Sequence, residues 1–228
     1  MRPLHLVAGL AAMFCAMQAT SLRADGPSSV WQAAFPIAAA PAHVHFHARY
    51  LDGHGAPHTL EVWRDGEQRL RRKSDAAIDL YAEQKPGGEI EFHIVDHSRG
   101  IVVHANRAAL YRVGRFSGWL GLAHVLDVPH GAYMVTALAT PPEVKSGGPC
   151  HWYRLEVTIL APKVSDVCWS ATWGLPAEIK AVDADGTPST VQFSLDAVEV
   201  FQPTDDLFAF ENDKFVIIDA RPDDDLSD

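Results

Sequence analysis

The stretch that decides the fold runs from Cys150 to Gln202 and reads CHWYRLEVTILAPKVSDVCWSATWGLPAEIKAVDADGTPSTVQFSLDAVEVFQ. Turn-forming sequences such as Ala-Pro-Lys, Trp-Gly-Leu-Pro and Asp-Ala-Asp-Gly divide it into short apolar segments, as strands require and helices avoid. The pattern predicts an antiparallel meander of four strands, namely His151 to Leu160, Val164 to Ser170, Ala177 to Val182 and Ser189 to Val200.

Apolar side chains alternate with polar ones along these segments. Tyr153, Leu155 and Val157 fall at period two, and Val167 and Trp169 do the same in the next segment. Alternation of this kind indicates a sheet with one face turned to a core. An open sheet that is exposed to solvent on both faces is not stable. Helices of the same chain or an apolar ligand must therefore cover its inner side.

The rest of the chain extends this pattern. Turn residues separate further expected strands at Thr59 to Trp63, Gln68 to Lys73, Ile78 to Glu83, Ile90 to Val95 and Ile101 to His104. Together they predict one long antiparallel sheet. Helices are expected at Ser117 to Leu126, where Ser117 is placed to cap the helix and Pro129 stops it, and at Ser28 to Phe35.

The second half of the chain resembles a known superfamily. The residues that carry the likeness are Gly174-Leu175-Pro176, the turn Asp183 to Gly186, the alternating strand after it, and Phe208 and Phe210 ahead of Phe215 to Asp219. This pattern resembles the LolA/LolB-like superfamily, which includes periplasmic lipoprotein carriers and the sensor domain of RseB-type proteins. The resemblance implies a mainly β (α+β) fold, a curved antiparallel half-barrel with a few helices covering its concave face.

In that superfamily the cavity under the helices receives acyl chains. The resemblance therefore points to an apolar site under a lid that contains Trp119 and Leu122, although the same residues also suit an ordinary core. The arginine that helps to lock the lid in the carriers is not identifiable here, and we expect no second domain like that of the RseB-like sensors. The candidate cavity residues are Trp63, Tyr81, Phe92, Trp119, Leu122, Tyr153, Trp169, Trp173 and Phe193.

The first residues have the pattern of a secretory signal. An uncharged apolar run from Leu6 to Ala19 follows a basic start and is too short to span a bilayer. We expect cleavage after Ala24, with Ala19 as the alternative, and hence a periplasmic protein that does not span the membrane. Residues 25 to 222 are expected to form one domain, followed by an acidic tail at 223 to 228.

The charge of the chain excludes some partners. Its formal charge is −10, and removal of the signal takes away Arg2 and Arg23, which makes the mature protein more acidic. Nucleic acids and anionic membranes would be repelled by such a surface. The expected partners are an apolar ligand or a lipoprotein, or an envelope protein complex.

Two cysteines remain after cleavage, Cys150 and Cys168. In an oxidising compartment such a pair predicts a disulfide, and the absence of C-x-x-C spacing favours a structural role. A hairpin that turned at Ala161 to Lys163 would leave the pair too far apart to bond. Either the turn lies nearer Ile159, or Gly147-Gly148-Pro149 folds Cys150 back.

Three alternating histidines raise a second hypothesis. In a strand, His43, His45 and His47 project from one face, with His54 and His58 nearby. Imidazole ligates copper and zinc, so a periplasmic metal-binding protein is the alternative function; otherwise these residues form a polar strand face and there is no cofactor.

Signals for catalysis are weak. The sequence has no G-x-S-x-G, no phosphate-binding glycine loop and no H-E-x-x-H. We therefore expect a binding protein rather than an enzyme: an exported carrier or sensor that holds an apolar, acyl or lipoprotein-type ligand. A third hypothesis is a subunit of an envelope complex without a small ligand.

Overall fold

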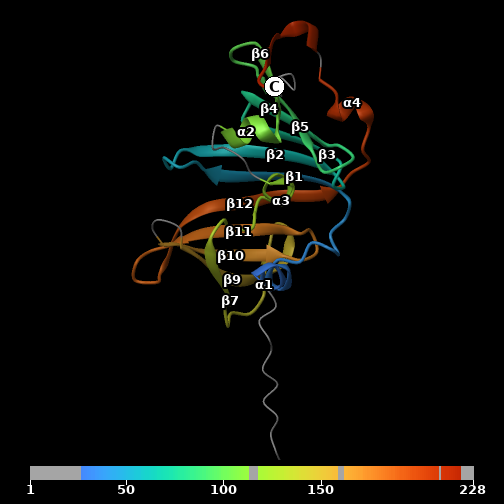
Figure 1. Cartoon of the computed structure of the whole chain (residues 1–228). Coiled ribbons are helices and arrows are strands. Elements are labelled where there is room, and N and C mark those ends of the chain that lie inside the picture. The colour runs from blue at the N-terminus through green and yellow to red at the C-terminus, as the bar shows by residue number, and fades with distance from the viewer. Residues whose placement is uncertain (1–26, 113–117, 159–161, 211, 222–228) are drawn as a thin grey trace, which may run out of the picture.

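The computed structural model describes residues 27–112, 118–158, 162–210 and 212–221 (Figure 1). The expected signal peptide, its cleavage sites, the acidic tail and Ser117 lie outside these residues. The cap of the helix that begins at Trp119 is Gly118, without a side-chain hydrogen bond, and not Ser117 as expected.

The described chain contains four short α-helices and a single sheet of thirteen strands. The helices are α1 (Pro27–Ala34), α2 (Arg107–Arg112), α3 (Trp119–His124) and α4 (Asp205–Phe208). The strands are β1 (His43–Leu51), β2 (Pro57–Asp65), β3 (Arg69–Ser74), β4 (Ile78–Gln84), β5 (Ile90–Asp96), β6 (Ile101–Asn106), β7 (Ala132–Ala137), β8 (Glu143–Lys145), β9 (Gly148–Thr158), β10 (Pro162–Ser170), β11 (Leu175–Val182), β12 (Pro188–Val200) and β13 (Val216–Asp219). All of the strands expected from the sequence are present.

The sheet is open and curved, and its order is β13-β6-β5-β4-β3-β2-β1-β12-β11-β10-β9-β7, with β8 beside β9. Two meanders meet at its centre, where β1 pairs antiparallel with β12 (Figure 1). The pair β13 and β6 at one edge is parallel, so the sheet is mixed. Apart from this edge, the expected curved, mainly antiparallel sheet is confirmed.

Turn glycines separate the strands where the sequence requires them. Between β11 and β12, Gly186 has φ of +83°, a conformation that glycine adopts without steric cost. Its N–H donates to the Asp183 carbonyl, and the Asp183 N–H donates to the Thr187 carbonyl at 2.9 Å. The motif Asp183 to Gly186 therefore closes this hairpin as expected.

Helices α1, α2 and α3 cover the concave face. Buried residues of β1 to β6, β11 and β12 pack there against α2 and α3, and α1 packs against β7, β9 and β10. The main cluster includes Phe46, Val62, Leu70, Phe92, Leu122, Phe193 and Leu195.

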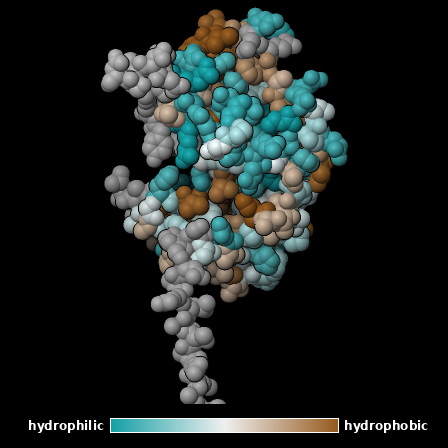
Figure 2. All heavy atoms as spheres, turned by 45° about the vertical axis from the view of Figure 1, so that its right-hand side comes forward, coloured by the Kyte–Doolittle hydropathy of each residue, from teal (hydrophilic) through white to brown (hydrophobic). Residues whose placement is uncertain are grey.

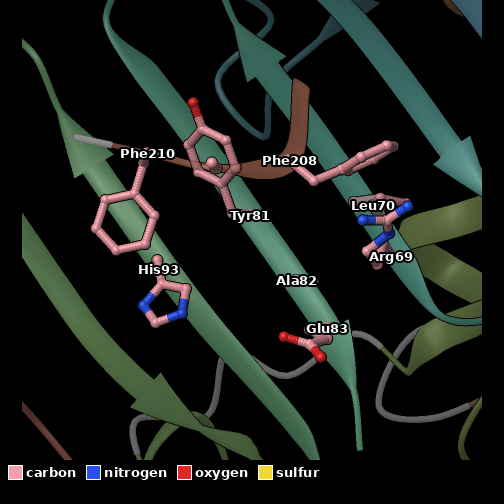
Figure 3. A pocket seen from close by; sticks show the side chains of 9 residues that line it. Arg69, Leu70, Tyr81, Ala82, Glu83, His93, Phe208 and Phe210 are labelled. Atoms are coloured by element: carbon pink, nitrogen blue, oxygen red, sulfur yellow. The ribbon is translucent and has the colours of Figure 1, made fainter. Parts of the chain in front are cut away.

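The convex face of β1 to β6 is covered as well, by residues 201–210 and 212–221, which we call the C-terminal strap. Phe208 lies over the Arg69 guanidinium, and Phe210 packs on the rings of Tyr81 and His93, with centroids 5.5 and 4.5 Å away (Figure 3). The strap ends in β13, which joins the sheet beside β6.

The disulfide between Cys150 and Cys168 is present, with a Cα–Cα distance of 5.3 Å. In the register of β9 and β10, Thr158 pairs with Pro162 and Trp152 pairs with Cys168. This register brings the two cysteines within bonding distance, which a turn at Ala161 to Lys163 would not; the turn expected near Ile159 falls on residues 159–161, outside the described residues. Both cysteines are fully buried, as a structural bond requires.

Candidate functional site

An apolar cavity of about 410 Å³ lies between α1, α3 and the sheet. Its volume falls in the range of about 300 to 1,000 Å³ in which proteins hold small ligands. Among the described residues that line it, His124 is the one ionisable side chain. The lining residues are Trp31, Gln32, Phe35, Pro36, Ile37, Ala38, Leu120, His124, Leu126, Val128 and Trp169.

Helix α1 forms one wall. Trp31 and Phe35, four residues apart, lie on the same side of the helix, and both are buried, with ring centroids 4.6 Å apart. Phe35 packs edge-on against Trp169 at 5.3 Å, and the Trp169 indole N–H donates to the Pro36 carbonyl at 3.1 Å. The segment from α1 to residue 37 is thus fixed to β10 by aromatic contacts and one hydrogen bond.

Helix α3 and the loop after it form the opposite wall. Asp127 accepts hydrogen bonds from the N–H groups of Gly118 and Val128, at 2.7 and 2.9 Å, and so holds both ends of this segment together. Val125 ends the helix at φ of +67°, which turns the chain back over the sheet. This local geometry presents Leu120, Leu126 and Val128 to the cavity.

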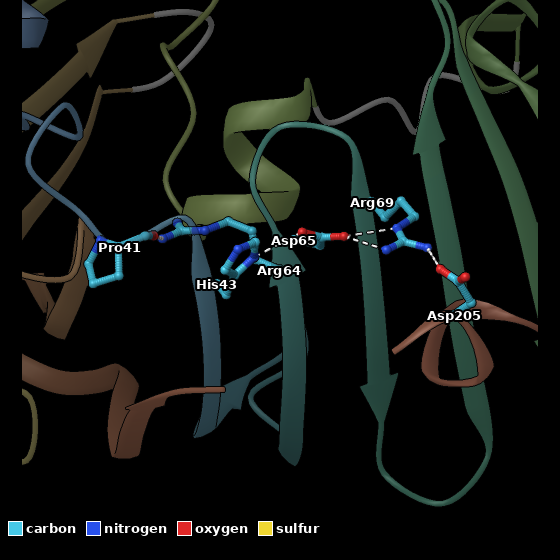
Figure 4. Close-up of polar contacts among 6 residues, drawn as sticks. All are labelled: Pro41, His43, Arg64, Asp65, Arg69 and Asp205. Carbon is cyan, nitrogen blue, oxygen red and sulfur yellow. Dashed lines mark hydrogen bonds and ion pairs between the residues drawn. The ribbon is translucent and has the colours of Figure 1, made fainter. Parts of the chain in front are cut away.

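Buried Arg64 ties α3 to the sheet. Its guanidinium donates to the carbonyls of Ala123 at 3.2 Å and Pro41 at 3.1 Å, and its Nη1 lies 2.7 Å from Nδ1 of His124 (Figure 4 draws the Pro41 contact). The same Nδ1 lies 2.7 Å from the Gly174 carbonyl. It can accept from Arg64 or donate to Gly174, but a neutral imidazole nitrogen cannot do both.

Burial controls the charge of this pair. Desolvation and the charge of Arg64 lower the pKa of His124 to about 4, so the ring is neutral at pH 7. Desolvation lowers the pKa of Arg64 to about 10, which leaves it a cation. Within the described part of the chain no carboxylate forms an ion pair with Arg64, and backbone carbonyls take that role.

A second cavity, of about 430 Å³, opens on the other side of the α3 segment. Leu60, Phe193 and Ile179 contribute to its apolar wall, and Arg72 and Lys163 add positive charge. Burial lowers the pKa of Arg72, partly offset by its contact with Tyr50. Leu126 borders both cavities.

Seven of the nine cavity residues predicted from sequence lie on the concave side. Trp169 lines the first cavity and Phe193 the second. The other five belong to the surrounding apolar clusters, in which Phe92 and Leu122 are buried and Trp119, Trp173 and Tyr153 pack at the margin.

The prediction for Trp63 and Tyr81 is wrong, because both lie on the convex face. Trp63 stacks on the His45 ring at 4.8 Å, and Tyr81 packs under Phe210 of the strap. Val62 and Ala82, their neighbours in sequence, occupy the concave positions. Since the strap covers the convex face, that side of the sheet is also rich in aromatic residues, and alternation alone does not distinguish the two faces.

Sequence reasoning missed Arg64 and underrated α1. Alternation from Leu60 and Val62 places Arg64 on the inner face, and a charged residue at an apolar position of a strand signals a special role. For Trp31 and Phe35 the signal was their helical spacing.

The histidines of β1 separate into two groups. Nε2 of His45 and Nε2 of His47 lie 3.1 and 3.4 Å from Oε1 of Glu61, so these three side chains offer one metal-type donor each. His43 instead lies 2.9 Å from Asp65, which also accepts from Arg69 (Figure 4). His58 contacts Asp75 and Asp52. The expected trio of His43, His45 and His47 is therefore not brought together.

Figure 2 shows hydrophobic side chains gathered in a band below the middle of one face, with mainly hydrophilic side chains above it, and a further hydrophobic cluster at the top end. Within the described residues, the helices are too short or too polar to cross a membrane.

No protein-family model matches the sequence, and no curated protein matches it. Solved structures are similar at a distance. MucB is 12% identical, with a TM-score of 0.45, over 84% of this chain and 66% of that one. An uncharacterized conserved protein from Thermus thermophilus is 8% identical, with a TM-score of 0.49, over 84% and 98%. The Pseudomonas aeruginosa MucA/MucB complex structure is 12% identical, with a TM-score of 0.45, over 82% of this chain and 62% of that one. The chain thus spans slightly less than two thirds of these MucB chains.

Proposed function

We propose that the protein is an exported binding protein that holds an acyl chain, free or carried on a lipoprotein, between α1, α3 and the concave face of its sheet. The observation that supports this function is the apolar cavity of about 410 Å³, walled by Trp31, Phe35, Leu120, Leu126 and Trp169. The buried disulfide supports export, because such bonds persist in oxidising compartments. The role is binding rather than catalysis.

Apolar burial supplies the affinity. At about 25 cal/mol per Å², a chain that loses about 300 Å² of accessible surface gains about 7.5 kcal/mol, and the loss of ligand freedom on association reduces this. We therefore expect dissociation constants in the micromolar range or weaker. Little directional contact is needed, so chain length should matter more than chemical detail.

The test is displacement of the apolar dye N-phenyl-1-naphthylamine by dodecanoate, followed by dye fluorescence. We expect saturable dye binding, displacement by dodecanoate, and weaker displacement by hexanoate. Replacing Leu120 by Trp fills the cavity and should reduce dye affinity at least tenfold.

The matched control is Val144→Trp, which adds the same ring on β8 at a site 81% exposed, outside both cavities. It should bind dye like the unmodified protein. If both variants bind equally well while circular dichroism shows both folded, the dye does not enter this cavity and the proposed function fails.

A further inference from the structure

The convex face carries a second arrangement of functional groups, away from the apolar cavity. His45 and His47 alternate on β1, so both rings project from that face, and their centroids are 4.7 Å apart. Glu61 on β2 stands directly opposite His47 in the register of the two strands. The sheet pairing itself brings the three side chains together.

Their donor atoms have nearly the spacing of a metal site. Oε1 of Glu61 lies 3.1 and 3.4 Å from Nε2 of His45 and His47, and all three donor atoms lie within 4.8 Å of one another. Tetrahedral coordination with bonds of about 2.05 Å places neighbouring donors about 3.3 Å apart. Small side-chain rotations would bring the set to that geometry.

The surroundings of His45 provide an independent indication. Its Nδ1 lies 3.0 Å from Glu199 on β12, while its Nε2 faces Glu61. With a cation bound at Nε2 beside Glu61, the Nδ1–H remains free to donate to Glu199. A carboxylate that accepts from the second ring nitrogen is the usual support of a metal-bound histidine.

The ring of His45 is also held in orientation. Trp63 stacks on it with planes 5° apart and centroids at 4.8 Å, and Phe201 of the strap lies 6.5 Å away on an edge contact. The His45 side chain is 15% exposed, whereas His47 is 48% exposed. One donor is thus fixed and partly buried, and the site stays open to solvent on the His47 side.

We propose that His45, His47 and Glu61 bind a divalent cation of the Zn²⁺ or Cu²⁺ type, with Glu199 orienting His45 and solvent completing the coordination. Two imidazole nitrogens and one carboxylate suit these ions, whereas Mg²⁺ and Ca²⁺ prefer oxygen donors. His43 is not a ligand, because its Nδ1 lies 2.9 Å from Asp65 instead (Figure 4).

The test is isothermal titration of the purified, chelator-treated protein with ZnCl₂, and with MgCl₂ as the control ion. We expect one equivalent of Zn²⁺ and no Mg²⁺ binding. His45→Ala, His47→Ala and Glu61→Gln should each weaken Zn²⁺ binding a hundredfold or more, and Glu199→Gln about tenfold.

His43→Ala is the matched control, since it removes an imidazole from the same strand and face but should keep Zn²⁺ binding within about twofold. Circular dichroism checks that every variant is folded. If the unmodified protein takes up no Zn²⁺, or if His43→Ala weakens binding as much as His47→Ala, the assignment is overturned. Dye binding in the apolar cavity is measured separately, so failure of one proposal leaves the other standing.

Discussion

Arg64 occupies a position of β2 at which alternation demands an apolar side chain, and it is only 3% exposed. Burial of an unpaired cation is costly, and here carbonyls from three separate segments compensate: residue 41 before β1, residue 123 in α3 and residue 173 before β11. A hydrophobic residue would fill the same space without that cost. Arginine at this position therefore fixes α3 over the sheet, and its burial lowers the stability of the fold.

His124, the neighbour of Arg64, should make stability depend on pH. Its pKa in the folded protein is about 4, against an ordinary value of 6.5, so the unfolded chain binds this proton more tightly. The resulting contribution to the free energy of unfolding is full above pH 6.5 and is lost as the pH falls towards 4. Its size is about 3 kcal/mol. Urea unfolding from pH 7 to pH 4 should show His124→Asn losing about that much less stability than the unmodified protein.

The control is His58→Asn. Asp75 raises the pKa of His58 in the folded protein, so this histidine stabilises the fold at low pH and the contribution disappears as the pH rises. In His58→Asn, the free energy of unfolding should therefore fall between pH 7 and pH 4 by at least as much as in the unmodified protein. If the free energy of unfolding falls equally with pH in His124→Asn and in the unmodified protein, His124 is not the source of the pH dependence.

At the scale of elements, sequence patterns predicted the strands well because their signals are local. Turns such as Asp183 to Gly186 end one strand and begin the next whatever surrounds them. Pairings between distant strands have no such signal: β1 lies beside β12, more than 140 residues later, and β13 joins β6 in parallel. Strand β8 has only three residues and no residue of β7 is buried, so both lack the apolar signal of a core strand, and neither was predicted.

Helix α3 should depend on Arg64 for its position. Arg64→Met keeps most of the side-chain volume but removes the hydrogen bonds to the carbonyls of Ala123 and Pro41. Each of these bonds stabilises the fold by about 1.5 kcal/mol. Relief of the buried charge offsets part of this loss, so we expect amide hydrogen exchange in residues 120–125 to accelerate tenfold to a hundredfold. Amides of β12 should exchange at an unchanged rate.

Arg49→Met is the control for this experiment. Arg49 lies on β1 and donates to Asp196, but its side chain is 68% exposed, and surface ion pairs contribute little. Exchange in α3 should stay as in the unmodified protein. Equal protection of α3 in both variants would mean that apolar packing alone holds the helix.

At the scale of the whole molecule, the strap explains why the candidate site was only partly predictable. The chain leaves β12 at the centre of the sheet, crosses the convex face of β1 to β5 and ends beside β6. It turns an expected solvent face into a second, aromatic interior, which is where Trp63 and Tyr81 lie. Which of two apolar faces encloses the cavity depends on this long-range crossing, and no local pattern of β2 or β4 encodes it.

The strap should therefore contribute to the stability of the entire sheet. Phe210 is half-buried against Tyr81, His93 and His104, with ring centroids 4.5 to 5.9 Å away. Truncation to Ala at a fully buried site costs about 3 to 5 kcal/mol, so we expect Phe210→Ala to lower the free energy of unfolding by about 2 kcal/mol. Val216→Ala, in the same strap but 66% exposed, should change it by less than about 0.5 kcal/mol. Because every strand belongs to one sheet, the urea transition of Phe210→Ala should shift as a single step. A separate early transition confined to the strap would instead show that the strap unfolds independently and does not support the sheet.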